Sequence, residues 1–150
     1  MAVTLPMSVR NAQAQVIVNA IHDGGGETLP TGAPCLIIYD GVRPTDPSVP
    51  VSAQTVCAIL NFPSLTPCTL NPGEDTITFE APDDETSATG SDVNGATWAR
   101  IWTDYDGNGI GIIDLSVGSV GSGADIELNS TSISTGATVS ITGLTYQIPN

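Results

Sequence analysis

Residues 103–109, TDYDGNG, combine the residue types and the spacing of a calcium-binding loop. Asp104, Asp106 and Asn108 fill the first, third and fifth positions of such a loop, and a glycine follows at the sixth. The twelfth position should hold a bidentate acid, but it is Leu115 here. Both flanks are strand-like, and Asp-Gly-Asn-Gly is a strong signal for a tight hairpin turn. We therefore expect a β-hairpin, with weak calcium binding at its tip as the alternative.

The histidine and cysteine content leaves little room for nucleophilic catalysis. His22 is the only histidine, and it ends a helical segment, where a cap or surface role is expected. The three cysteines, Cys35, Cys57 and Cys68, contain no CxxC pair, so a zinc site is not expected. Cys35 and Cys57 lie in apolar runs and should be small buried hydrophobes, with a disulfide as the alternative.

Acidic and aromatic residues raise two further possibilities. Residues 83–85, Asp-Asp-Glu, could mimic the paired carboxylates of a glycosidase, but such pairs need a fixed separation and these acids adjoin on a polar loop. Trp98, Arg100 and Trp102 alternate onto one face of a predicted strand. The two tryptophans should belong to a core or an interface, and an exposed sugar-stacking platform is the alternative. No P-loop, GxSxG or dinucleotide motif occurs, so no enzymatic activity is expected.

One helix should precede the strands that position these residues. Residues 7–22, MSVRNAQAQVIVNAIH, have helical periodicity, with Ser8 as the expected N-cap and glycines just after the end. Apolar residues at three- and four-residue steps predict a single stripe along this helix: Val9, Ala12, Val16, Ile17, Ala20 and Ile21.

After the helix, short apolar or alternating runs predict strands that are separated by turn-rich loops. The expected strands are residues 35–39, 55–60, 76–79, 96–103, 110–117, 124–128 and 137–148. Prolines make 42–54 and 62–74 loops, and 80–95 is an acidic loop that should be solvated. These spacings are typical of an antiparallel β-sandwich or jelly roll. We therefore expect a mainly β chain with a segment and helix over 1–24 and one sandwich domain over 25–150.

The charge balance excludes two classes of partner. Sixteen acids stand against three arginines, no lysine is present, and the net charge is −13. Nucleic acids and anionic membranes both need cationic groups, so neither is an expected partner. No apolar run reaches the ~18 residues of a membrane span, and the first residues lack the features of a signal peptide. We expect synthesis in the cytoplasm.

Several segments together resemble a group of small tailed-phage virion proteins. The segments are VTLPMSVRNAQAQVIVNAI, CLIIYDGVRPTDP, TVCAILNFP, GATWARIWTDYDGNGIGIIDLSVG and GADIELNSTSISTGATVSITGLTYQIP. Members of the group share an N-terminal helix, an IYDG-x-RP segment, a strand–DxDG–strand hairpin and a similar ending. The group resembles capsid decoration, or cement, proteins with sandwich or jelly-roll folds. The three cysteines and the long proline-rich loops depart from this pattern and leave the lateral contacts and the thiol state open.

The resemblance implies a virion structural protein on the capsid surface, with no catalytic residues and no cofactor. Its expected partners are the major capsid protein, between whose capsomers it would bind, and copies of itself in a homotrimer. Candidate interface residues lie on the helix, in the first proline-rich loop and on the tryptophan strand: Val9, Arg10, Val16, Arg43, Pro44, Trp98 and Trp102. The alternatives are a carbohydrate- or receptor-binding module of a tail or fibre, and a calcium-dependent structural module.

Overall fold

The computed structural model describes residues 5–22, 33–92, 94–104 and 109–149 of the 150-residue chain. The elements within these residues are α1 (Met7–His22), β1 (Cys35–Asp40), β2 (Val56–Asn61), β3 (Cys68–Asn71), β4 (Thr76–Phe79), β5 (Ala96–Trp102), β6 (Gly111–Ser119), β7 (Ile126–Leu128) and β8 (Leu144–Gln147). This order confirms the predicted fold class, a mainly β, sandwich-like domain with one N-terminal helix.

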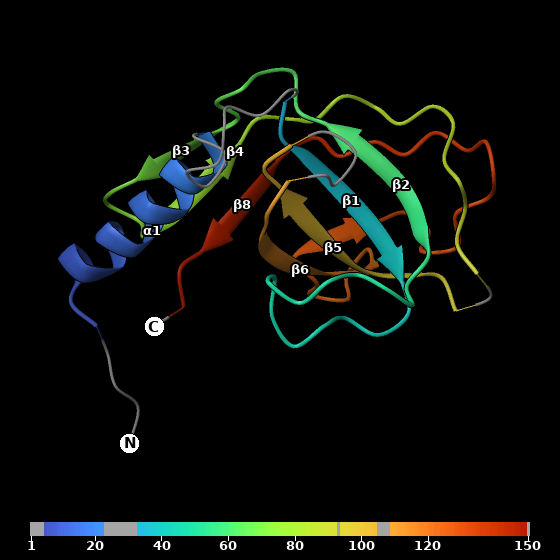
Figure 1. Ribbon diagram of the computed structural model, residues 1–150, viewed down its shortest axis with the longest axis horizontal. Helices are drawn as coiled ribbons and strands as arrows, with labels where there is room; N and C mark the ends of the chain where they lie inside the picture. The colour runs from blue at the N-terminus through green and yellow to red at the C-terminus, as the bar shows by residue number, and fades with distance from the viewer. Residues whose placement is uncertain (1–4, 23–32, 93, 105–108, 150) are drawn as a thin grey trace.

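The strands form two sheets. The larger sheet has the order β2-β1-β5-β6-β7, and the smaller has the order β3-β4-β8. Neighbouring strands are antiparallel except for β6 and β7, which run parallel. Figure 1 shows the larger sheet on one side of the molecule and α1 with the smaller sheet on the other.

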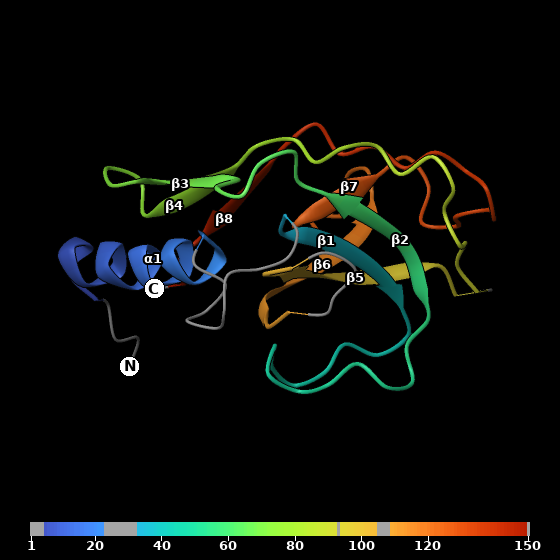
Figure 2. The same cartoon turned by 45° about the horizontal axis from the view of Figure 1, so that its top comes forward.

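Strand β1 is buried on both of its faces. All six of its residues are buried, which explains why residues 35–39, CLIIY, form a continuous apolar run rather than an alternating one. Its inner face, Leu36 and Ile38, joins Ala99 and Ile101 of β5 in the main core. Its outer face lies under the proline-rich loop of residues 41–55. Figure 2 shows this loop on the opposite side of the larger sheet from residues 80–92 and 130–140.

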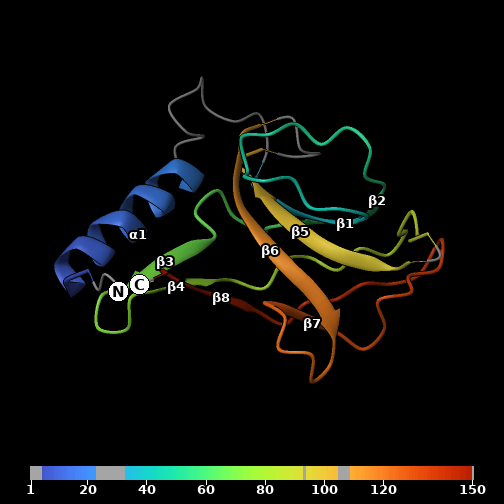
Figure 3. The same cartoon turned by 90° about the horizontal axis from the view of Figure 1, so that it is seen from below.

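Helix α1 covers the smaller sheet and spans the predicted residues 7–22. It lies alongside β3 and β4 in Figure 3. Ala14, Val18 and Ile21 are buried, and Ile17 is partly buried against the same core. Each fully buried Val or Ile side chain contributes roughly 1.5–3 kcal/mol, so these few contacts hold the helix in place.

The prediction of a single apolar stripe on α1 is wrong, because only part of the predicted stripe packs against the core. Ile17 and Ile21 face the sheet, but Val9 and Val16 are 42% and 67% exposed. At about 100° per residue, Val9 and Val16 lie on the side of the helix opposite Val18. The helix therefore has two apolar faces, and one of them points to solvent.

Three boundaries also differ from prediction. Helix α1 begins at Met7, so Ser8 lies inside its first turn and the carbonyl of Pro6 accepts the first amide bonds. The predicted loop 62–74 contains β3, which pairs along its length with β4 despite the flanking prolines. The predicted strand 137–148 is regular only at β8, because residues 136–139 bond to residues 85–88 instead.

The acidic loop 80–95 was expected to be solvated, but its described residues are only partly exposed. The amides of Asp83 and Gly90 donate to β2 carbonyls, those of Asn61 at 2.8 Å and Cys57 at 3.1 Å. Ala88 is 1% exposed within the core. The backbone of this segment thus covers the free edge of β2, which would otherwise offer unpaired groups to another chain. Within the described part of the chain, no helix has the length and apolar content to cross a bilayer.

Candidate functional site

A buried arginine lies at the centre of the outer face of the larger sheet. Arg100 of β5 is 0% exposed and lies between Trp98 and Trp102, which share its face of the strand as predicted. Its guanidinium carbon is 5.3 Å from the ring centroid of Trp98 and 5.4 Å from that of Trp102. Both distances allow cation–π attraction, which strengthens where water is excluded.

Asp114 of β6 neutralises this cation. The antiparallel register places it directly opposite Arg100. Its Oδ1 accepts from Nε at 2.6 Å and its Oδ2 accepts from Nη2 at 2.9 Å, a bidentate arrangement. The side chains of Arg100 and Asp114 are 0% and 7% exposed, so the two charges compensate each other's loss of hydration. We call Tyr39, Trp98, Arg100, Trp102 and Asp114 the arginine cluster.

The remaining donors of Arg100 fix the middle of loop 41–55. Nη1 donates to the carbonyl of Val49 at 2.8 Å, and Nη2 donates to the carbonyl of Asp46 at 3.2 Å. Gly111 allows this close approach, since a Cβ there would lie 2.6 Å from Arg100 Cδ and 2.7 Å from the Pro47 carbonyl oxygen. One buried side chain thus determines the position of an otherwise exposed loop.

The two ends of the same loop are held by side chains as well. Oδ1 of Asp40 accepts from the amide of Thr55 at 2.9 Å, and Nε2 of Gln54 donates to the carbonyl of Val42 at 2.6 Å. Between these anchors, the side chain of Val42 is 82% exposed and that of Val49 is 36% exposed. Loop 41–55 therefore presents apolar groups to solvent on a fixed backbone.

Tyr39 closes the cluster on the side of β1. Its ring stacks on Trp98 with centroids 4.4 Å apart, and its oxygen accepts from Nε1 of Trp102 at 3.1 Å. Burial raises the pKa of Tyr39 to about 12, so its hydroxyl stays protonated at neutral pH. Trp98 is 1% exposed, so the core reading of this residue is confirmed and an exposed platform of two tryptophans is not formed.

A hollow of about 630 Å³ lies between loop 41–55 and the larger sheet. Ile37, Val56 and Ile59 line it from β1 and β2, and Trp102 lines it from β5. Residues 47–52 of the loop complete its rim. Arg100 is the one charged side chain among the described residues that line the hollow, which we call the outer hollow.

The arginines predicted at an interface differ in environment. Arg43 is exposed and Pro44 is half-buried in loop 41–55. Arg10 instead pairs with Asp75, with Nη2 and Oδ2 2.8 Å apart, and so links α1 to the turn between β3 and β4. Its side chain is 16% exposed, which leaves it little surface for a partner.

The strands of the predicted hairpin are confirmed by the antiparallel pairing of β5 with β6. Thr103 and Ile110 close it, with the Thr103 amide donating to the Ile110 carbonyl at 3.1 Å. Of the calcium candidates, Asp104 is half-buried, whereas Asp106 and Asn108 lie outside the described residues. Strands on both sides exclude an EF-hand. In the part of the chain that the structure describes, no three His, Cys, Asp or Glu side chains are grouped to hold a metal ion.

The histidine lies beside a cysteine, yet this pair lacks an activated nucleophile. Nε2 of His22 is 3.0 Å from the carbonyl oxygen of Cys68 and 3.5 Å from its sulfur, which joins α1 to β3. Burial raises the pKa of Cys68 to about 12 and that of Cys57 to about 11, so both are neutral thiols near pH 7. Cys35, Cys57 and Cys68 are all buried, which confirms the prediction that Cys35 and Cys57 are small buried hydrophobes, and Cys57 and Cys68 form no disulfide.

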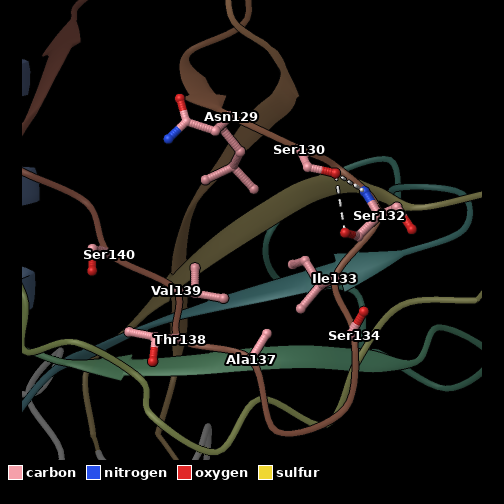
Figure 4. Close-up of a pocket in the computed structure, with 10 residues that line it drawn as sticks. Asn129, Ser130, Ser132, Ile133, Ser134, Ala137, Thr138, Val139 and Ser140 are labelled. Carbon is pink, nitrogen blue, oxygen red and sulfur yellow. Dashed lines mark hydrogen bonds between the residues drawn. The ribbon is translucent and has the colours of Figure 1, made fainter.

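A second, smaller pocket of about 350 Å³ lies near β7, between residues 128–134 and 137–140 (Figure 4). Serine, threonine and asparagine side chains surround apolar residues that include Ile133 and Val139. Ser130 bonds to the backbone of Ser132, so part of this hydroxyl set is engaged within its own turn. None of the described residues lining this pocket is titratable, so it offers no acid–base pair.

Comparison of the chain with protein-family models, with curated proteins and with solved structures finds no match.

Proposed function

We propose that this chain is a structural protein of a tailed-phage virion, a decoration protein that binds between capsomers on the outside of the head. The resemblance in sequence motifs supports this class of protein. The observation that carries the proposal is a fully buried arginine that is used to hold an exposed, partly apolar loop in one conformation. A loop fixed in this way loses little conformational entropy on binding, so more of its contact energy appears as affinity.

The outer face of α1 is the second surface that supports docking. Val9 and Val16 are exposed there, and the helix contains no acidic residue in a chain of net charge −13. A partner can therefore approach this face without meeting the repulsion that most of the surface imposes. We propose that α1 and loop 41–55 both contact the major capsid protein or neighbouring copies in a homotrimer.

Binding to an assembled lattice would stabilise the head without any chemistry. A ligand that binds the lattice and not its separated subunits stabilises the lattice by mass action. Closed symmetric oligomers are the usual form of such assemblies, which is why a trimer is the proposed unit.

The test is attachment of purified protein to undecorated heads, measured by sedimentation and by particle imaging. We expect copies at regular lattice sites, with attachment weakened at least about tenfold by Val42→Glu or Val16→Glu, because each places an unpaired charge in the contact. Leu65→Glu and Val120→Glu are matched controls, since these side chains are 56% and 66% exposed outside both surfaces. Full attachment of a Val16→Glu, Val42→Glu double variant would refute the proposed contacts, and absence from all heads would refute the function.

A tail- or fibre-associated carbohydrate- or receptor-binding module is the second candidate. It is favoured by one observation, the position of Trp102 on the wall of the outer hollow. Glycan-array binding that is lost in Trp102→Ala, together with density on the tail rather than the head, would support this candidate over decoration.

A further inference from the structure

The outer hollow has the size and lining of a site for an aromatic group. Its volume of about 630 Å³ falls within the range of roughly 300–1,000 Å³ that is common for ligand sites. The described lining is aliphatic on β1 and β2, with Ile37, Val56 and Ile59, and aromatic on β5, with Trp102. A flat ring packs well against such a combination, because an indole offers an edge or a face for aromatic contact.

One polar group that lines the hollow donates no hydrogen bond within the described residues. The oxygen of Tyr39 accepts from Nε1 of Trp102, and no hydrogen bond donated by the Tyr39 O–H is found among the described residues. Tyr39 is 3% exposed and lines the hollow. A buried donor without an acceptor is costly, so a ligand that supplies an acceptor gains more there than it would in water. Because burial holds the pKa of Tyr39 at about 12, the group remains a donor across the neutral range.

The charges around the hollow favour a neutral occupant. Arg100, the charged side chain of its described lining, is already bonded to both carboxylate oxygens of Asp114 and to two loop carbonyls. The net charge of −13 opposes an anionic ligand.

The polar lining is poorly suited to a sugar. The side chain of Ser48 bonds to Asp46, and Oε1 of Gln54 accepts from the amides of Ser52 and Ala53. These loop groups are therefore engaged with their own segment, whereas a sugar needs several hydroxyl partners that are free to bind it.

We propose that the outer hollow receives an uncharged aromatic side chain that carries a hydrogen-bond acceptor, with tyrosine as the matching residue, from a neighbouring protein of the assembly. The ring packs between Trp102 and the aliphatic side chains of β1 and β2, and the phenol oxygen accepts from Tyr39. This inference rests on the proposed function for the source of the tyrosine, but the site itself can be tested on the isolated protein.

The test uses 4-methylphenol as the probe, with toluene lacking the acceptor and methyl glucoside representing a sugar. Binding is followed by the NMR shift of the Trp102 indole N–H. We expect 4-methylphenol to bind more tightly than toluene and methyl glucoside to leave the signal unchanged. Tyr39→Phe keeps the stacked ring and should lower the affinity for 4-methylphenol about fivefold, which is the effect of one hydrogen bond. The affinity for toluene should not change.

Variants that fill the hollow provide the second arm. Ile59→Trp and, independently, Val56→Phe should abolish binding of both aromatic probes, whereas Leu65→Trp at a remote exposed position should not. An unshifted Trp102 signal in the unaltered protein, equal 4-methylphenol binding by Tyr39→Phe, or stronger binding of methyl glucoside would overturn the site. Probe binding by a protein that never attaches to heads would refute the proposed function but support the site. Attachment to heads without probe binding would refute the site but support the proposed function.

Discussion

Replacement of Arg100 by methionine tests the central feature of the structure. Methionine keeps much of the aliphatic volume between Trp98 and Trp102, but it removes the positive charge and all of the guanidinium donors. Asp114, whose side chain is 7% exposed, is then left as a buried carboxylate without its partner. The carbonyls of Asp46 and Val49 lose their anchor as well.

The expected cost of Arg100→Met is large. Loss of one member of a buried ion pair costs about 3–5 kcal/mol, mostly because the other charge stays buried. We expect the free energy of unfolding to decrease by about 4 kcal/mol, the middle of this range. The released loop carbonyls add little to this cost, because they can turn towards water. For a chain of this size each kcal/mol corresponds to about 2–4 °C, which gives a fall in Tm of roughly 12 °C. The urea midpoint should fall by about 2 M if m is about 2 kcal/mol/M.

Two measurements separate this effect from simple loss of packing. Hydrogen exchange of the Val49 amide, which bonds to Asp46 at 3.1 Å, should accelerate in Arg100→Met because the loop is released. The double variant Arg100→Met, Asp114→Leu removes both charges and should recover most of the stability while the loop remains released. Arg43→Met is the control, because Arg43 is exposed and its loss should change stability by less than about 0.5 kcal/mol. A cost below about 1 kcal/mol for Arg100→Met would refute the anchoring role, given the size expected for a buried pair.

Two further predictions concern the helix and the thiols. Val18→Ala should lower the free energy of unfolding by about 2 kcal/mol, whereas Val16→Ala should lower it by less than about 0.5 kcal/mol, because only Val18 is buried. Equal losses of stability in urea titrations would contradict the assigned helix face. Because Cys57 and Cys68 have folded-state pKa values of about 11 and about 12 against 9.0 ordinarily, the unfolded thiols ionise first as pH rises. The free energy of unfolding should therefore fall above pH 9, by up to about 1.4 kcal/mol per pH unit for each thiol. The contribution of the two thiols should be nearly constant between pH 7 and 8.5.

Much of the larger sheet is predictable because local patterns and tertiary burial agree there. The continuous apolar run of β1 matches a strand covered on both faces, and the alternation of β5 matches a strand between two different clusters. The antiparallel pairing of β5 with β6 was predictable from the Asp, Asn and Gly residues in the sequence between them. In each case the residues that determine the local structure are close in sequence.

The partner of Arg100 could not be predicted in this way. Counting outward from the closing pair Thr103 and Ile110 would place Ile113 opposite Arg100. The register shifts between Ile101 and Trp102, and this irregularity brings Asp114 into the opposite position instead. A shift of one residue exchanges the two faces of a strand, so the whole cluster depends on a detail of pairing that the sequence pattern does not contain.

The faces of α1 were mispredicted for a related reason. Periodicity identifies which residues share a side of a helix, but it does not say which side the sheet will take when apolar residues cover more than half of the circumference. Ala14 and Val18 pack against the core, whereas Val16 is exposed to solvent. The misprediction therefore reveals a surface with no partner among the described residues.

The distribution of the three arginines leads to a last prediction. Arg10 and Arg100 are engaged in ion pairs with Asp75 and Asp114, which leaves Arg43 as the exposed arginine of the described chain. Arg43 lies in loop 41–55, so the proposed contact carries positive charge on a molecule of net charge −13. A cation at the edge of a contact steers association more than it adds affinity, and salt screens it over about 8–10 Å.

Arg43→Met should therefore slow attachment to heads several-fold at low ionic strength while leaving the dissociation rate and the free energy of unfolding nearly unchanged. The difference between Arg43→Met and the unaltered chain should shrink as salt is raised towards 0.5 M, because the Debye length falls to about 4–5 Å. Kinetics of attachment to immobilised heads would measure both rates. Equal association rates at low salt would mean that loop 41–55 does not meet the head, and the proposed contact would then rest on α1 alone.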